Sequence, residues 1–240
     1  MEIEGKRVLV TGASRGLGRA LVTAFVDAGA AEVLAGTRKI KDRKTLLSAH
    51  VTPVRLDVTS DRDVEVLAGM GAVDILINNA GIAGYGNPLT MSFAAIQEEI
   101  AVNYLGVLRV TRAITPGMIA KHDGVIVNVA TAFAKVNLPM IGTYCATKAA
   151  LLSLGQALRA YLSDHGIRVI TVMPTTIDTD MSRGADVPKM TKEFVAAEIL
   201  TAIREEKYDP PIGDEAKDVF DGLQKDPLAF EKMLMNYRAS

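Results

Sequence analysis

The chain has 240 residues, 49% of them hydrophobic, which is enough to bury the core of one α/β domain spanning residues 1–240. A formal net charge of −1 and the lack of an apolar run of about 18 residues argue against a nucleic acid or a membrane as a partner. The single cysteine, Cys145, excludes an internal disulfide and favours a cytoplasmic protein, and the three histidines are spaced too widely to predict a metal site.

Short apolar runs alternate with longer amphipathic segments along the chain. In chain order we expect strand 6–12, helix 16–28, strands 32–38 and 51–58, helix 61–69, strand 73–81, helix 90–121, strand 124–130, helix 144–163, strand 167–174 and helix 191–206. The Val, Ile and Leu residues of the strands do not alternate with polar ones, as expected when both faces are buried. The pattern predicts an α/β fold: one Rossmann-type, doubly wound, mostly parallel sheet with helices on both faces.

Residues 180–240 should form a substrate loop followed by a C-terminal region. The segment YDPPIGD, residues 208–214, predicts a short edge strand, because its prolines exclude a central one. An amphipathic pattern over residues 226–238 predicts a final helix.

The segment TGASRGLG, residues 11–18, connects the first expected strand to the first expected helix. Its three glycines allow a tight turn and a close approach of the backbone to a pyrophosphate at the helix N-terminus. The spacing G-x-x-x-G-x-G differs from the commoner G-x-G-x-x-G, and such a loop alone could be a simple turn. Its place at the first strand-to-helix turn of a βαβ pattern favours dinucleotide binding.

The end of the second expected strand bears on the choice of dinucleotide. An acid there would bind the ribose 2′-hydroxyl of NAD, whereas an arginine would accept the 2′-phosphate of NADP. The strand ends in Gly36-Thr37-Arg38 with no acid, and Arg15 supplies a second cation, which favours NADP(H) unless both arginines are merely solvated. Asp57 could accept a hydrogen bond from the adenine amino group or cap the helix that starts near Asp61.

Six motifs occur in the order and at the intervals typical of the short-chain dehydrogenase/reductase family, which the chain resembles over residues 5–181. They are TGASRGLG (11–18), LDV (56–58), NNAG (78–81), Asn103 in NYLG, Tyr144-x-x-x-Lys148 and MPTTIDT (173–179). A nucleotide-binding methyltransferase would share the first strand and glycine turn but would not account for NNAG or the Tyr-Lys pair. The resemblance implies that a nicotinamide dinucleotide is bound by Gly12, Ser14, Arg15, Gly16, Leu17, Gly18, Thr37, Arg38, Asp57, Val58, Asn79, Ala80, Gly81, Tyr144, Lys148, Pro174, Ile177 and Thr179.

Tyr144 and Lys148 stand four residues apart, so they share one face of their expected helix, either as exposed side chains or as a proton donor with its tuning charge. A free tyrosine has a pKa of about 10, and a neighbouring ammonium would lower that pKa towards the working range. The resemblance implies that Tyr144 protonates a carbonyl oxygen, that Lys148 also binds the nicotinamide ribose, and that Asn103 holds a water linking Lys148 to solvent. Judged from the residues alone, Asn103 would be a helix kink or a surface amide.

The chain departs from the family pattern at three places. Thr131 replaces the usual serine thirteen residues before the tyrosine; it keeps the hydroxyl, so we expect its donor role to survive, the alternative being an inactive site. Thr175 replaces the glycine that usually follows the proline of the sixth strand, so that turn could follow a different path. The usual Asp-Gly-Gly ending is also missing, which leaves the closure of the pocket and the subunit contacts open.

We expect the substrate pocket to be apolar or hydroxylic. Its expected residues are Ala132, Phe133, Leu138, Met140, Ile141, Thr175, Thr176 and Met181. Such a lining suits a small apolar or aromatic ketone or aldehyde, and the apolar residues on several faces of helices 90–121 and 144–163 predict a homodimer or homotetramer. The leading function is NADPH-dependent carbonyl reduction; the alternative is a weakly active or inactive NADPH-binding sensor or scaffold protein.

Overall fold

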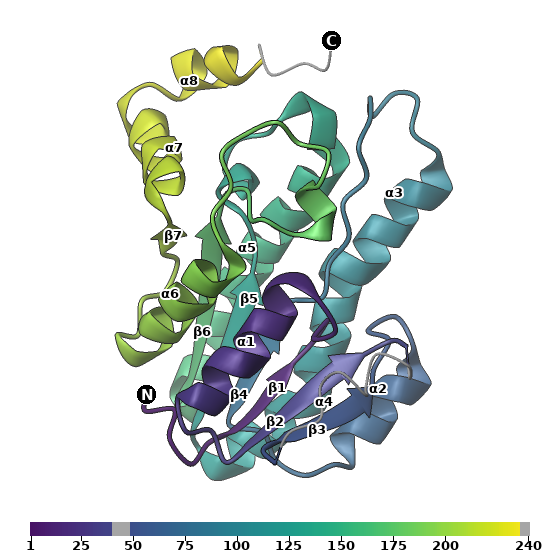
Figure 1. Ribbon diagram of the computed structural model, residues 1–240, viewed down its shortest axis with the longest axis vertical. Helices are drawn as coiled ribbons and strands as arrows, with labels where there is room; N and C mark the ends of the chain where they lie inside the picture. Colours follow the sequence, from purple (N-terminus) through teal and green to yellow (C-terminus); the bar gives the residue numbers. More distant parts are fainter. Residues whose placement is uncertain (40–48, 236–240) are drawn as a thin grey trace.

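The computed structural model describes residues 1–39 and 49–235. Within these residues, seven strands form one sheet in the order β3-β2-β1-β4-β5-β6-β7, and every neighbouring pair is parallel (Figure 1). The strands are β1 (Arg7–Val10), β2 (Glu32–Thr37), β3 (Val51–Arg55), β4 (Ile75–Asn78), β5 (Gly124–Val129), β6 (Ile167–Pro174) and β7 (Pro211–Ile212). The predicted doubly wound α/β fold is confirmed.

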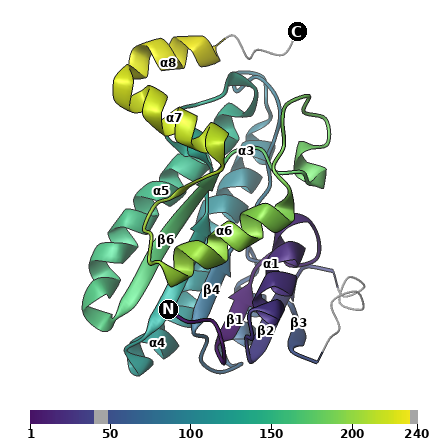
Figure 2. The same cartoon turned by 60° about the vertical axis from the view of Figure 1, so that its left-hand side comes forward.

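Helices cover both faces of this sheet (Figures 1 and 2). On one face, α1 (Gly16–Asp27) and α6 (Lys192–Arg204) pack Phe25 and Ile199 against strand residues such as Val10. The other face is covered by α2 (Asp61–Ala68), α4 (Val107–Lys121) and α5 (Gly142–Leu162), which bury side chains such as Leu67 and Met118. Strand residues with no alternation are therefore buried from both sides, as the sequence predicts.

The sheet order reverses between β1 and β4, which are neighbours in the sheet although two strands separate them in the chain. The connection after β1 turns towards α1 on one face, and the chain after β4 turns towards the other. Ligands of open parallel sheets bind outside the carboxyl ends of the strands at such a switch point. This geometry places the glycine loop and the NNAG segment side by side.

The expected helix 90–121 consists of three pieces. Ser92 caps α3 (Phe93–Ile100) by accepting a hydrogen bond from the backbone N–H of Ala95, and a π-helical segment, η2 (Ala101–Gly106), joins α3 to α4. Single π-helical turns occur often at functional sites. Here the widened turn carries Asn103. This agrees with the interpretation of Asn103 as a helix kink.

The C-terminal region contains one helix that the sequence did not predict. The short edge strand β7 is confirmed, and α8 (Pro227–Leu234) covers most of the expected last helix, whose residues 236–238 lie outside the described residues. Between them lies α7 (Asp214–Lys225), whose sequence DEAKDVFDGLQK buries only Ala216 and Val219 among its residues. Both helices lie beyond the carboxyl end of the sheet (Figure 2).

Four 3₁₀ turns complete the structure in the described residues: η3 (Ala132–Ala134), η4 (Pro139–Ile141), η5 (Ser163–His165) and η6 (Asp180–Ser182). None of the described helices combines the length and apolar character required to cross a membrane.

Candidate active site

The glycine loop is shaped for a close approach of its backbone to neighbouring groups. Gly12 and Gly16 have φ values of 67° and 55°, a region that disfavours other L-residues. A Cβ on Gly18 would lie 2.2 Å from the carbonyl oxygen of Gly12 and 2.6 Å from Nδ2 of Asn79. The N-cap of α1 is Arg15, whose side chain caps no backbone N–H, so the first turn keeps donors for an anion.

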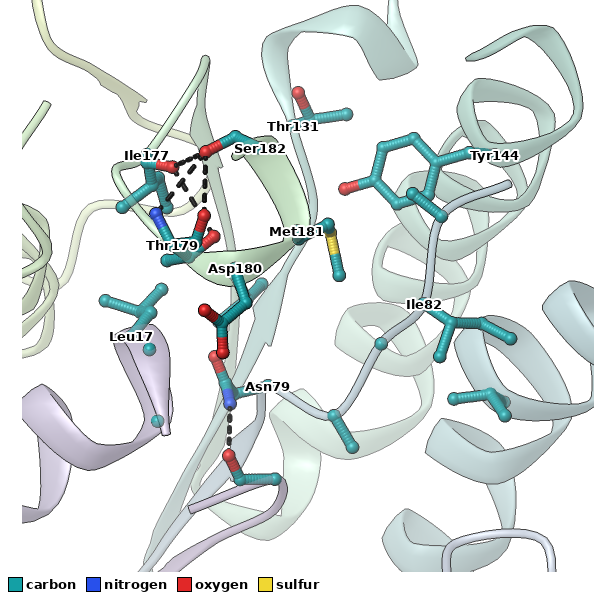
Figure 3. Close-up of a pocket in the computed structure, with 18 of the residues that line it drawn as sticks. Leu17, Asn79, Ile82, Thr131, Tyr144, Ile177, Thr179, Asp180, Met181 and Ser182 are labelled. Carbon is teal, nitrogen blue, oxygen red and sulfur yellow. Dashed lines mark hydrogen bonds between the residues drawn. The ribbon is translucent and has the colours of Figure 1, made fainter. Parts of the chain in front are cut away.

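Asn79 fastens the loop after β4 to the glycine loop. Its Nδ2 donates a hydrogen bond of 2.9 Å to the carbonyl oxygen of Thr11, and its backbone N–H donates to the Thr11 hydroxyl at 3.0 Å. These hydrogen bonds join the two loops on either side of the switch point, which together form one side of a cavity (Figure 3).

The cavity has a volume of about 1050 Å³ and runs along the carboxyl ends of the strands. All of the eighteen residues expected to bind a dinucleotide line it, from Gly12 at the glycine loop to Thr179 after β6. These residues fit a dinucleotide. Arg38 supplies a positive charge at one end of the cavity, and the N-terminus of α1 has N–H groups that no side chain caps. The glycines between them leave space that a Cβ would fill. The motifs thus predicted residues that line one cavity, and their binding of a dinucleotide stays a prediction.

Asp57 does not cap α2, so that alternative is wrong. Ser60 is the cap, accepting a hydrogen bond of 3.2 Å from the backbone N–H of Asp63. Asp57 lines the cavity, and its Oδ1 accepts bonds from the N–H and hydroxyl of Thr59 at 3.0 and 2.7 Å. Burial alone would raise the pKa of Asp57, but these bonds and the charge of Arg38 hold the pKa below its ordinary value.

The two arginines expected near a 2′-phosphate have different surroundings. Arg38 is exposed at the end of β2 and lines the cavity. Arg15 reaches across the cavity mouth, where its Nη1 lies 3.0 Å from Oδ2 of Asp180, and Arg183 pairs with the same carboxylate. Sequence spacing does not predict a carboxylate beside Arg15, so the expectation of two cations without a neighbouring acid is corrected, and Arg38 is the better placed of the two.

Tyr144 and Lys148 both line the cavity from α5. The hydroxyl of Tyr144 points into the space between Thr131 and Met181 (Figure 3). Lys148 is buried, its Nζ donating a hydrogen bond of 2.8 Å to the carbonyl oxygen of Val129 and lying 5.7 Å from the centre of the Tyr144 ring. The pair therefore faces the cavity and is not an exposed helix surface.

The pKa of Tyr144 moves in the direction opposite to the sequence expectation. Burial raises it above its ordinary value, and Cys145, Tyr85 and Glu99 add to the rise. Burial also lowers the pKa of Lys148 to about 8. The enclosure of both groups outweighs the simple pairing of a phenol with a cation.

Asn103 is fully buried behind the cavity wall and does not line it. Its Oδ1 accepts a bond from the N–H of Ile82 at 2.9 Å, and its Nδ2 donates to the Ile82 carbonyl and the Thr147 hydroxyl at 2.8 and 3.0 Å. Both amide hydrogens are used, so the side chain ties the segment after NNAG to α5. Whether Asn103 also holds a water stays a prediction.

The two threonines that replace family residues both face the cavity. Thr131 begins η3, its Oγ1 accepting a weak bond of 3.4 Å from the N–H of Phe133. Thr175 is buried, and its Oγ1 has no hydrogen-bond partner among the described residues. Its backbone needs no glycine, since positive φ at non-glycine positions in the described chain occurs only at His122 and Glu206.

The substrate half of the cavity differs from the expected lining at one residue. Phe133, Leu138, Met140, Thr175 and Met181 line it, as do Ile141 and Thr176. Ala132 does not: it is fully buried in a cluster with Val219 of α7, so its assignment to the substrate is corrected. Cys145 belongs to the same cluster, in agreement with a packing role.

Sequence reasoning missed Tyr85, which also lines the cavity. Its hydroxyl donates a hydrogen bond of 3.0 Å to the carbonyl oxygen of Met181, so the segment after NNAG touches the loop after β6. The available signal was an aromatic residue placed shortly after NNAG, which alone indicates little.

A sequence model of the family described as short chain dehydrogenase matches residues 6–188. The chain belongs to the short-chain dehydrogenase/reductase family. This confirms the resemblance read from the six motifs.

Members of this family with related sequences include several reductases. An L-xylulose reductase from Bos taurus is 35% identical over 189 residues, covering 77% of each chain, and a D-erythrulose reductase from Gallus gallus is 36% identical over 187 residues, covering 76% of each. A short-chain dehydrogenase from Burkholderia cenocepacia, solved in complex with NADP, superimposes with a TM-score of 0.94 at 35% identity, covering 98% of this chain and 99% of that one. The chain is therefore similar to these oxidoreductases over most of its length.

Proposed function

We propose that this short-chain dehydrogenase/reductase catalyses the NADPH-dependent reduction of a small ketone or aldehyde to an alcohol, and the reverse oxidation. The observation that carries the proposal is the position of the Tyr144 hydroxyl. It points into the cavity where the dinucleotide arm meets an apolar pocket, with the Lys148 ammonium one helical turn away.

The chain's own residues supply the proton and its control. NADPH, when bound, supplies the hydride for the carbonyl carbon. The Tyr144 hydroxyl, which is protonated at neutral pH, donates its proton to the carbonyl oxygen. The Thr131 hydroxyl, in the same part of the cavity, donates a hydrogen bond to that oxygen and stabilises its developing charge. Lys148, with a pKa of about 8, is mostly charged at neutral pH, and its ammonium stabilises the phenolate that forms as the proton leaves Tyr144.

Arg38 and the related NADP complex support NADP(H) over NAD(H) as the cofactor. Arg38 lines the cavity at the end of β2, where its planar guanidinium can form paired hydrogen bonds to a phosphate. Asp57 lies nearby, where it can accept a bond from the adenine amino group.

The proposed substrate is a small apolar or aromatic carbonyl compound. Phe133, Leu138, Met140 and Met181 surround the space in front of Tyr144. The related reductases are named for sugars, and the unpartnered Thr175 hydroxyl inside the cavity would suit a hydroxyketone, so short ketoses form the competing class. We also propose a cytoplasmic homodimer or homotetramer, which Leu105, Ile119 and Tyr161 support as exposed apolar residues on η2, α4 and α5.

The direct test follows NADPH oxidation with a panel of aryl ketones, aldehydes and short ketoses. Tyr144→Phe should lower turnover by roughly 10²–10⁴-fold, the contribution of a general acid. Binding should be unchanged, and NADPH fluorescence can report it without tryptophan background, because the sequence contains no tryptophan. Tight NADPH binding with no turnover of any compound would instead support the alternative, an NADPH-binding sensor or scaffold.

A further inference from the structure

Glu99 is a buried acid beside the site that the proposed mechanism does not use. It lies on α3, and only 2% of it is exposed, whereas its neighbour Glu98 on the same helix is exposed. An acid is rarely buried unless it is paired with a cation or hydrogen-bonded. The helix could bury an apolar residue at this place at lower cost.

Only one of the two oxygens of the Glu99 carboxylate has a hydrogen-bond partner among the described residues. Oε1 accepts a hydrogen bond of 2.5 Å from the backbone N–H of Gly84. Oε2 is buried and has no hydrogen-bond partner in the described part of the chain. Leaving a buried polar oxygen without a partner costs stability, so its presence calls for a functional explanation.

The Gly84 contact fixes a segment of the cavity wall. Ala83 and Tyr85, on either side of Gly84, both line the cavity, and Tyr85 bonds to Met181 across it. Gly84 is closely packed: a Cβ there would lie 2.7 Å from Cε of Met91 and 3.1 Å from Oε1 of Glu99. Glu99 therefore holds the wall of the substrate half from behind.

The negative charge of Glu99 also acts on Tyr144. Burial raises the pKa of both Tyr144 and Cys145, and the charge of Glu99 raises each further. The other titratable groups around Tyr144 are Cys145 and Lys148 on α5 and Tyr85 on the segment after NNAG, with Asp180 and Asp186 on the loop after β6 lining the same cavity. Asp180 is exposed and pairs with Arg15 and Arg183, so Glu99 is the buried acid of this group.

We propose that Glu99 is a positioning residue for the reaction, which rests on the proposed carbonyl reduction: its carboxylate holds the wall segment 83–85, and with it Tyr85, in place at the substrate half of the cavity. Losing the Gly84 hydrogen bond should loosen this wall and weaken substrate binding, whereas an amide at the same position can still accept the bond.

Three variants separate the charge from the contact. Glu99→Gln removes the charge and keeps an acceptor for Gly84, Glu99→Met removes both, and Glu98→Gln is the matched control on the exposed face of the same helix. With NADPH saturating, Glu99→Met should raise the KM for the carbonyl substrate roughly tenfold through loss of the Gly84 hydrogen bond, with a smaller change in kcat. Glu99→Gln should restore most of the wild-type KM, and Glu98→Gln should leave it unchanged. A Glu99→Met variant with the KM of the control would overturn the proposal.

A second readout does not depend on turnover. Hydrogen exchange of the Gly84 amide, followed by mass spectrometry or NMR, reports the contact itself: exchange should be faster in Glu99→Met than in the wild type, and close to wild type in Glu99→Gln and Glu98→Gln. Faster exchange in Glu99→Met when the wild type reduces no carbonyl compound would refute the proposed function and leave the Glu99 contact standing; an active wild type with no change in either readout would refute the Glu99 proposal alone. If Glu99→Gln does not fold, Glu99→Met carries the test, because an apolar residue in place of a buried charge is often tolerated.

Discussion

The Nζ atom of Lys148 lies 5.7 Å from the centre of the Tyr144 ring and donates a hydrogen bond of 2.8 Å to the carbonyl oxygen of Val129. This contact holds the ammonium at the cavity wall with little access to water. Burial destabilises the charged form of Lys148, and it therefore lowers the pKa from 10.5 to about 8.

Lys148→Met should therefore abolish turnover while stabilising the protein at neutral pH. Removing the buried charge saves on the order of 3 kcal/mol, and the unpaired Val129 carbonyl returns roughly 1–2 kcal/mol of that gain. Between pH 8 and 10.5 the unfolded lysine binds more protons than the folded one, so wild-type stability rises with pH there. The advantage of the variant, measured by urea unfolding, should be largest below pH 8 and shrink towards pH 10.5. A variant less stable than the wild type at pH 7 would contradict this account.

Arg38→Ala should weaken NADPH far more than NADH. A charged hydrogen bond to a phosphate contributes about 1.5–3 kcal/mol, which corresponds to a rise of roughly 10–100-fold in the KM for NADPH. Arg15→Ala should have a smaller effect, because Asp180 already holds that guanidinium at 3.0 Å. Arg204→Ala, an exposed substitution on α6, is the control for loss of one positive charge. Equal losses for the two cofactors in Arg38→Ala would count against NADP(H).

The Thr131 hydroxyl can be separated from its methyl group. Thr131→Val keeps the shape and removes the donor, so kcat should fall by roughly 10²–10³-fold, as for loss of one donor to a developing oxyanion. Thr131→Ser keeps the donor and removes the methyl group, so kcat should stay within a few-fold and bulkier ketones should gain. Steady-state kinetics on one small and one bulky ketone distinguish the outcomes, and equal activity in Thr131→Val would remove Thr131 from the mechanism.

The sheet could be predicted from the sequence because strands that are buried on both faces form continuous apolar runs. Each run of Val, Ile and Leu, such as Val125–Val127, is apolar on both faces and ends at a turn signal. Helix α7 has no such apolar run, because it buries only Ala216 and Val219 and its other residues are exposed or half-exposed. A helix that covers a loop and not a sheet needs only a narrow apolar stripe.

The dinucleotide half of the cavity was predictable because its residues follow strand ends, and strand ends of a parallel sheet meet at one edge. The substrate half depends on tertiary packing that sequence spacing does not encode. Ala132 turns towards α7 and not towards the cavity, and the burial that raises the pKa of Tyr144 requires the surrounding segments to be in place. Glu99 reads in the sequence as one of two adjacent acids on a helix, and only the structure shows which of the two is buried.

Gly18→Ala tests whether the glycine loop is packed as tightly as the structure indicates. The added Cβ would lie 2.2 Å from the Gly12 carbonyl oxygen and 2.6 Å from Nδ2 of Asn79, so the loop and α1 must move apart. Such overpacking costs about 1–3 kcal/mol, and the displaced Gly12 should raise the Kd for NADPH at least tenfold, or by about 1.4 kcal/mol. Gly69→Ala is the matched control: this residue caps α2 at a negative φ of −77°, and its Cβ would lie 3.5 Å from the nearest atom, an ordinary contact. Thermal unfolding and NADPH fluorescence titration should separate the two variants, and wild-type binding in Gly18→Ala would show that the glycine serves only as a turn.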